Sequence, residues 1–153
     1  MTILMWIGIV LGGLVLILVV LPIAWLMIKG TRPRGVAIEV AAPALVPAGE
    51  PFDIVVRVRN LLDRERTLRS IDLDNALLKG FSIESLTPEP IDKSSMLGTT
   101  AFHYKLTIPP RASVAISLRG RSLDSGDYSG TVMAYVDSAN ATSEDTTLRL
   151  VVR

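Results

Sequence analysis

The chain has 153 residues, of which 49% are hydrophobic, and it carries a formal net charge of +1 and no cysteine. This length suits one domain with an attachment. The near-neutral charge excludes the strongly basic footprint of a nucleic-acid-binding domain, and the lack of cysteine excludes a disulfide-stapled fold.

The first predicted element is a transmembrane helix anchor in residues 1–30. Residues 3–28 contain no charged side chain, and these 26 residues extend about 39 Å as a helix, more than the roughly 30 Å of a bilayer core. Trp6 and Trp25 lie near the two ends, where indole rings favour the membrane interface. A cleaved signal peptide is the alternative, but its apolar core would have about 7–15 residues and a basic segment before it.

Two glycines give this helix a candidate packing face. Gly8 and Gly12 are four residues apart, the small-xxx-small spacing that lets another membrane helix approach closely. Glycine is also generally frequent in membrane helices, so the spacing has a second explanation.

A basic juxtamembrane linker, residues 31–35, follows the helix. Lys29, Arg32 and Arg34 are expected at the membrane surface, where they contact anionic lipid. Because positive charges near a helix end favour the cytoplasm, the folded domain is predicted on the cytoplasmic side of a bacterial membrane. The sequon Asn140-Ala141-Thr142 would instead suit a domain on the other side.

Residues 36–153 are predicted to form an all-β domain. Apolar residues alternate with polar ones most clearly in 52–59, 101–108 and 114–119, as in strands with one face in a core. Weaker strand patterns occupy Val36–Val40, Thr67–Leu73, Phe81–Leu86, Tyr128–Val136 and Thr146–Val152. About 7–8 strands without a confident helix predict an antiparallel immunoglobulin-like β-sandwich. A closed barrel is the alternative.

The stretch "DSGDYSG" predicts a tyrosine corner, formed by Asp124, Gly126 and Tyr128. In such a corner the tyrosine hydroxyl bonds back to nearby backbone and fixes one crossing of the sandwich. Gly130 stands where an antibody domain has a cysteine. The core is therefore expected to depend on aliphatic side chains together with the aromatic residues Phe52, Phe81, Phe102, Tyr104 and Tyr128.

The segment from Val46 to Asn60 resembles the second strand of bacterial immunoglobulin-like adhesion and accessory domains, where a Pro-x-Gly-Glu turn leads into an alternating strand ending in Asn. The Ile108-Pro109-Pro110 turn, the 114–118 strand and "DSGDYSG" follow in the same order. The resemblance implies an interaction module but is shared by many functions. More loosely, the domain resembles the sandwich of membrane proteins that join transmembrane helices to a von Willebrand factor A domain, which is absent here.

No catalytic, cofactor or metal site is predicted. His103 is the only histidine, and on the polar face of its strand it is interpreted as a solvent-exposed residue. The acidic stretches "DLDN" and "DSANATSED" are interpreted as turns rather than calcium sites, because neither has EF-hand spacing. Arg57 and Arg59 share one strand face and form a candidate partner surface; the alternative is a solvated face whose charge nearby acids balance.

These observations predict a single-pass membrane protein with a non-catalytic sandwich that binds another membrane or membrane-proximal protein. The alternative is a small structural subunit of a larger membrane complex, held through its helix. An enzyme is the third hypothesis, for which no acid, base or nucleophile is assembled in the sequence. No nucleic acid, cofactor or small-molecule substrate is expected.

Overall fold

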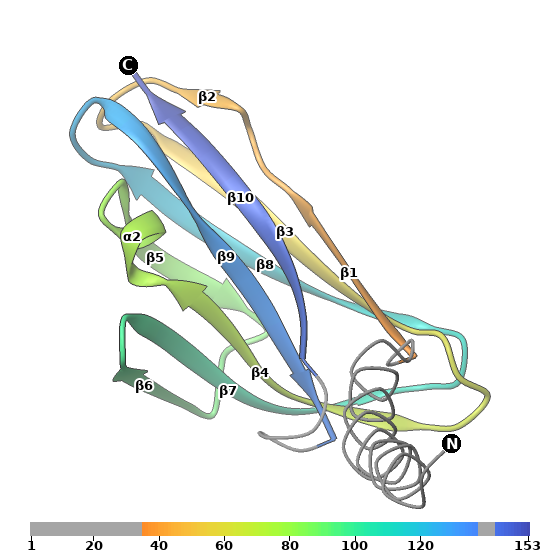
Figure 1. Ribbon diagram of the computed structural model, residues 1–153. Helices are drawn as coiled ribbons and strands as arrows, with labels where there is room; N and C mark the ends of the chain where they lie inside the picture. The colour runs from red at the N-terminus through yellow and green to blue at the C-terminus, as the bar shows by residue number, and fades with distance from the viewer. Residues whose placement is uncertain (1–34, 138–142) are drawn as a thin grey trace, which may run out of the picture. The chain divides into compact units, whose positions relative to one another are not determined.

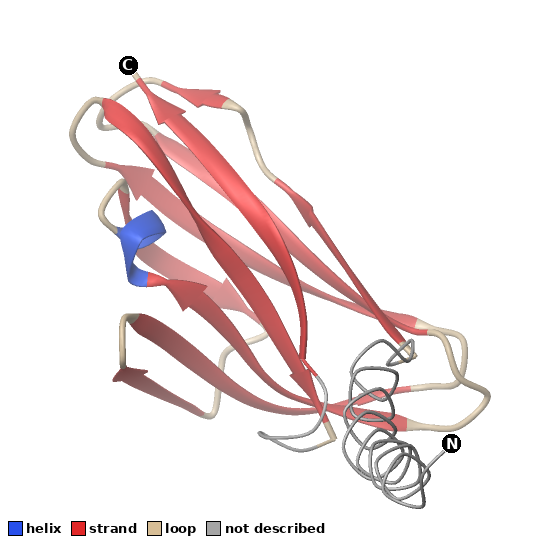
Figure 2. Cartoon of the chain, viewed as in Figure 1, coloured by secondary structure: helices blue, strands red, loops and turns tan. Residues whose placement is uncertain are grey.

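The computed structural model describes residues 35–137 and 143–153, all within the unit Arg34–Arg153. These residues form strands and one short helix (Figures 1 and 2). The elements are β1 (Val36–Ala41), β2 (Leu45–Val46), β3 (Pro51–Asn60), β4 (Arg66–Asp74), α2 (Asn75–Leu78), β5 (Phe81–Thr87), β6 (Asp92–Met96), β7 (Thr99–Ile108), β8 (Ser113–Ser122), β9 (Gly126–Val136) and β10 (Ser143–Val152).

The strands form two sheets, which confirms an all-β sandwich. One sheet has four strands in the order β1-β3-β8-β5, and the other has six in the order β2-β10-β9-β4-β7-β6. The ten strands of the described residues exceed the predicted number, because β2 and β6 were not expected. The expectation of purely antiparallel pairing is wrong at one edge, where β2 runs parallel to β10. The other strand pairs among the described residues are antiparallel.

The core lies between the two sheets and follows the period-two alternation of the sequence. On β3 the side chains of Ile54, Val56 and Val58 are fully buried, while the residues between them are exposed or partly exposed. Phe52 and Phe81 meet edge to face, with ring centroids 5.3 Å apart, a favourable geometry for aromatic pairs. The core is therefore aliphatic with aromatic contributions, as predicted.

One core side chain contains a buried polar atom. The Tyr104 side chain points inward from β7, and its hydroxyl is buried without a hydrogen-bond partner among the described residues. Burial raises the pKa of Tyr104 to about 12, because the charged phenolate loses its hydration.

The short helix α2 was not expected from the sequence. Its first turn is capped by Asp74, whose side chain accepts a hydrogen bond from the Ala76 backbone at 2.9 Å. Leu77 of the helix is fully buried in the core. The helix lies so close to β9 that a Cβ on Gly130 would stand 2.8 Å from the Cβ of Asp74 and 3.0 Å from that of Leu77. Position 130, where an antibody domain has a cysteine, has no room for a side chain here, because Asp74 and the helix occupy that space.

The asparagine that ends β3 connects two loops at one end of the sandwich. Asn60 is fully buried, and its amide nitrogen donates to the carbonyl oxygens of Arg64 at 2.7 Å and Pro109 at 3.1 Å. Its side-chain oxygen accepts from the Leu62 backbone at 3.0 Å. These bonds satisfy a buried polar group and hold the two loops together.

The predicted membrane helix lies outside the described residues. Within 35–137 and 143–153, no helix has the length and apolar character needed to cross a bilayer. The predictions for the anchor and its flank, which fall on residues 1–34, stay predictions; they concern Trp6, Gly8, Gly12, Trp25, Lys29, Arg32 and Arg34.

Candidate functional site

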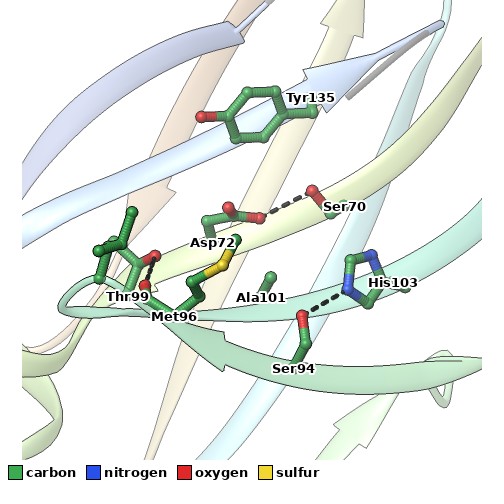
Figure 3. A pocket seen from close by; sticks show the side chains of 9 residues that line it. Ser70, Asp72, Ser94, Met96, Thr99, Ala101, His103 and Tyr135 are labelled. Atoms are coloured by element: carbon green, nitrogen blue, oxygen red, sulfur yellow. Dashed lines mark hydrogen bonds between the residues drawn. The ribbon is translucent and has the colours of Figure 1, made fainter. Parts of the chain in front are cut away.

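A hollow on the outer face of the six-stranded sheet is the best candidate for a binding site. Its volume is about 310 Å³, and it lies over β4, β6, β7 and β9, on the side of the sheet opposite the core (Figure 3). Its walls include Ser70 and Asp72 from β4, Ser94 and Met96 from β6, His103 from β7 and Tyr135 from β9.

Strand register explains why the sheet is hollowed here. Asp72 pairs with Ala101 of β7 on one side and with Met133 of β9 on the other. The small Ala101 side chain forms the floor of the hollow. The larger side chains of His103 and Tyr135 lie two residues further along β7 and β9, where both residues pair with Ser70. A bulge in β4 between Leu68 and Ser70 bends the strand at the edge of the hollow.

The hollow contains a carboxylate that no cation neutralises. Asp72 is half-buried, and its Oδ1 accepts a hydrogen bond from the Ser70 hydroxyl at 2.7 Å. In the described chain, no Lys, Arg or His nitrogen lies within 4.0 Å of its carboxylate oxygens. The site therefore presents local negative charge, hydroxyl groups and an aromatic ring to solvent.

A serine and a histidine are hydrogen-bonded at the rim of the hollow, which sequence reasoning missed. The Ser94 hydroxyl lies 2.8 Å from His103 Nε2. His103 lies on the outer face of β7, as predicted, and is partly exposed. In nucleophilic catalysis a third group typically orients the imidazole; the hydrogen bond described for the His103 side chain goes to Ser94 itself. That the protein is not an enzyme remains a prediction.

The turn beside the hollow has an unusual residue at its tip. Leu97 and Gly98 join β6 to β7, with φ angles of +49° and +85°. Positive φ at both positions of a two-residue hairpin loop is typical of a type I′ turn, which strongly favours Asn-Gly. Leu97 is 96% exposed, and its neighbour Met96 is 72% exposed. The turn thus places two apolar side chains in solvent at the edge of the hollow.

The predicted arginine surface lies on the other sheet. Arg57 and Arg59 are both exposed on β3, and neither lines the hollow. Arg57 is 3.8 Å from Glu39 on the neighbouring strand β1, its direct cross-strand partner. Arg59 lies opposite Ala37 and Ser113, which are small uncharged residues. This face carries charges of both signs, as the Arg57–Glu39 and Arg119–Asp53 pairs show.

The tyrosine-corner residues lie at the connection from β8 to β9. The Tyr128 hydroxyl donates to the carbonyl oxygen of Asp124 at 3.0 Å, as the sequence predicts. The ring packs against two glycines, because a Cβ on either Gly80 or Gly126 would clash with it. These residues hold the β8–β9 connection next to the start of β5, where Leu123 also bonds to the Gly80 carbonyl at 2.9 Å.

Comparison with known proteins identifies a fold and no family. No family model matches the sequence, and no curated protein matches it. Among solved structures, the chain is similar to a mutant Salmonella alpha-2-macroglobulin, with a TM-score of 0.52, 16% identity, and coverage of 78% of this chain and 7% of that one. It is similar to the cupredoxin domain of amoB from Nitrosocaldus yellowstonii, with a TM-score of 0.50, 12% identity, and coverage of 79% and 88%.

A CARDB domain from Pyrococcus furiosus also matches, with a TM-score of 0.49, 15% identity, and coverage of 77% of this chain and 94% of that one. Identities this low show the fold alone. The described part of the chain is a β-sandwich domain, consistent with the immunoglobulin-like fold.

Proposed function

We propose that the chain is a membrane-anchored, non-catalytic interaction module. Its sandwich binds another membrane or membrane-proximal protein through the hollow and the Met96–Leu97 turn, which replace Arg57 and Arg59 as the favoured partner surface. The observation that carries the proposal is the exposed leucine with positive φ at the tip of this turn.

The conformation and exposure of Leu97 are both energetically unfavourable for a leucine. The left-handed conformation disfavours a residue with a Cβ by roughly 1–2 kcal/mol, and asparagine or glycine would avoid most of that cost. At 96% exposure, the side chain gains almost nothing from burial within the described domain. Packing against another molecule would offset both costs, since exposed apolar groups beside a hollow are typical of protein contact sites.

The apolar N-terminal run supports the membrane part of the proposal. It has the length of a membrane-spanning helix, and the basic residues that follow it suit the headgroup surface. A domain held at a membrane by such an anchor meets partners confined to the same surface, which raises their effective concentration without any new contact.

Site-specific photo-crosslinking in native membranes tests the contact surface. A photoreactive amino acid at position 97 should form adducts with another protein, and the same amino acid at position 59, on the opposite sheet, should not. Leu97→Asn should weaken co-purification of the crosslinked partner, because it removes the apolar side chain while favouring the turn. Adducts at position 59 with none at position 97 would contradict the assignment.

The alternative function is that of a small subunit held through its membrane helix. Its basis is the Gly8 and Gly12 spacing, which suits close helix packing. Replacing both glycines with leucine should abolish co-purification under this alternative, whereas Leu97→Asn should have no effect. The reverse pattern supports binding through the sandwich.

A further inference from the structure

The hollow has the charge and shape to receive one particular kind of side chain. Given the proposed function, on which this step rests, we infer that the hollow binds an arginine side chain of the partner protein. The Asp72 carboxylate is the counter-ion and the Tyr135 ring is the surface on which the guanidinium packs. The adjoining Met96–Leu97 turn contacts apolar residues next to that arginine.

The negative charge of Asp72 favours a positively charged ligand. Asp72 is half-buried in the hollow, and the residues directly opposite it, Ala101 and Met133, are uncharged. The Ser70 hydroxyl bonds to one carboxylate oxygen but does not neutralise the charge. A cation entering the hollow would therefore gain an opposite charge that is partly shielded from water, where such pairs are stronger than at an open surface. An anion such as phosphate would be repelled.

The shape of the site favours arginine over other cations. The volume of about 310 Å³ is roughly ten times the volume that one water occupies in the liquid, so a whole side chain can enter. Figure 3 shows the Tyr135 ring and the Asp72 carboxylate on neighbouring strands, facing the same space. A planar guanidinium can bond to a carboxylate with two N–H groups and pack on an aromatic ring, which a lysine ammonium cannot do as well.

Hydroxyl groups around the hollow complete the match. Ser94 and Thr99 line it and offer oxygen acceptors to the remaining guanidinium N–H groups. The Ser94 hydroxyl can keep its contact with His103 by donating to the imidazole while accepting from the ligand. A guanidinium has five N–H donors and no acceptor, so a site rich in acceptors suits it.

Saturation-transfer NMR of the full chain in zwitterionic nanodiscs tests this inference. The probe is the blocked tetrapeptide Ser-Arg-Ser-Leu, and its control carries citrulline, an uncharged analogue of similar shape, in place of arginine. Empty nanodiscs provide the blank. The arginine peptide should bind about fivefold more tightly than the citrulline peptide.

Three variants locate the binding in the hollow. Asp72→Asn should remove the preference for arginine over citrulline. Asp92→Asn is the matched control: Asp92 is exposed on β6 opposite His103 and does not line the hollow, so this variant should retain the preference. Ala101→Arg should abolish peptide binding, because an arginine directly opposite Asp72 would pair with it and fill the hollow.

Equal binding of the two peptides, or an unchanged preference in Asp72→Asn, would overturn the inference. Failure of the arginine inference can be distinguished from failure of the proposed function by comparing the peptide and crosslinking results. If crosslinks persist at position 97 while the peptides show no arginine preference, the sandwich binds a partner but not through an arginine. If both results are negative, the proposed function fails as well.

Discussion

Asp137→Asn should destabilise the sandwich by removing one charge from a partly buried ion pair. Arg66 lies at the start of β4 with its side chain 3% exposed, and its Nε donates to the Asp137 carboxylate at 2.8 Å. The second carboxylate oxygen accepts a hydrogen bond from the Thr67 backbone at 3.0 Å. Asp137 has a φ of +68°, a conformation that asparagine also tolerates, so the substitution changes the charge and leaves the backbone preference unchanged.

The size of the effect follows from burial. Removing one partner of a fully buried ion pair costs about 3–5 kcal/mol, but the Asp137 side chain is 40% exposed and water can replace part of the interaction. We therefore expect a loss of about 2 kcal/mol in the free energy of unfolding near neutral pH. For a domain of this size, such a loss lowers the melting temperature by about 8 °C.

The effect should depend on pH in a defined direction. Burial alone would raise the pKa of Asp137, but the hydrogen bond from the Thr67 backbone and the Arg66 guanidinium outweigh this effect and hold the pKa below the ordinary value of an aspartate. A lowered folded-state pKa contributes stability above the unfolded-state value and loses it as pH falls toward the folded-state value. The gap between wild type and variant should therefore be full above about pH 5 and shrink as the pH falls through 4.

Far-UV circular dichroism of the full chain in mild detergent, melted at several pH values, measures this gap. Melting temperatures that agree within about 1 °C at pH 7 would show that water screens the pair and that burial of Arg66 does not strengthen it. A gap that persists unchanged at pH 3 would show that the loss comes from packing and not from charge.

Further expected outcomes concern single side chains and the membrane topology. Leu97→Asn should raise stability by about 1 kcal/mol, because Asn-Gly suits the type I′ turn; a lower melting temperature would contradict the strain argument. Tyr128→Phe should cost about 1 kcal/mol through its lost hydrogen bond, while Tyr104→Phe should be neutral or stabilising because it removes an unpaired buried hydroxyl. Because the pKa of Tyr104 is raised to about 12, wild type should lose stability between about pH 10 and 12, and Tyr104→Phe should lose less. Single cysteines introduced at positions Thr2 and Ser143 can be labelled with a membrane-impermeant thiol reagent. In intact cells the cysteine at position 2 should react and the cysteine at position 143 should be protected. Labelling at position 143 would instead place the domain outside.

The strands that bury one face could be predicted, because burial imposes the alternation that the sequence shows. β3, β7 and β8 follow this rule, and the Tyr128 bond follows from a local motif. β6 was not predicted, because all five of its side chains are exposed and its sequence therefore shows no alternation of apolar and polar residues. The Leu97-Gly98 turn lacks the Asn-Gly signal that identifies most such hairpins.

The hollow itself could not be predicted. It depends on which residues of β4, β7 and β9 stand side by side, and that register is set by pairing between segments far apart in the chain. Asp72 and His103 each looked like an ordinary polar residue of a strand or turn. Asp72 and His103 line the same hollow because the small Ala101 side chain lies between larger neighbours. That arrangement becomes apparent only when the register of the strands is known.

The close approach of α2 to Gly130 has a consequence for where the domain can work. A disulfide across a sandwich forms only in an oxidising compartment and is lost in a reducing one. Here a buried leucine on a capped helical turn packs where that bond would begin, and the whole chain contains no cysteine. No disulfide can therefore form within this chain, so the stability of the sandwich does not depend on a thiol–disulfide equilibrium.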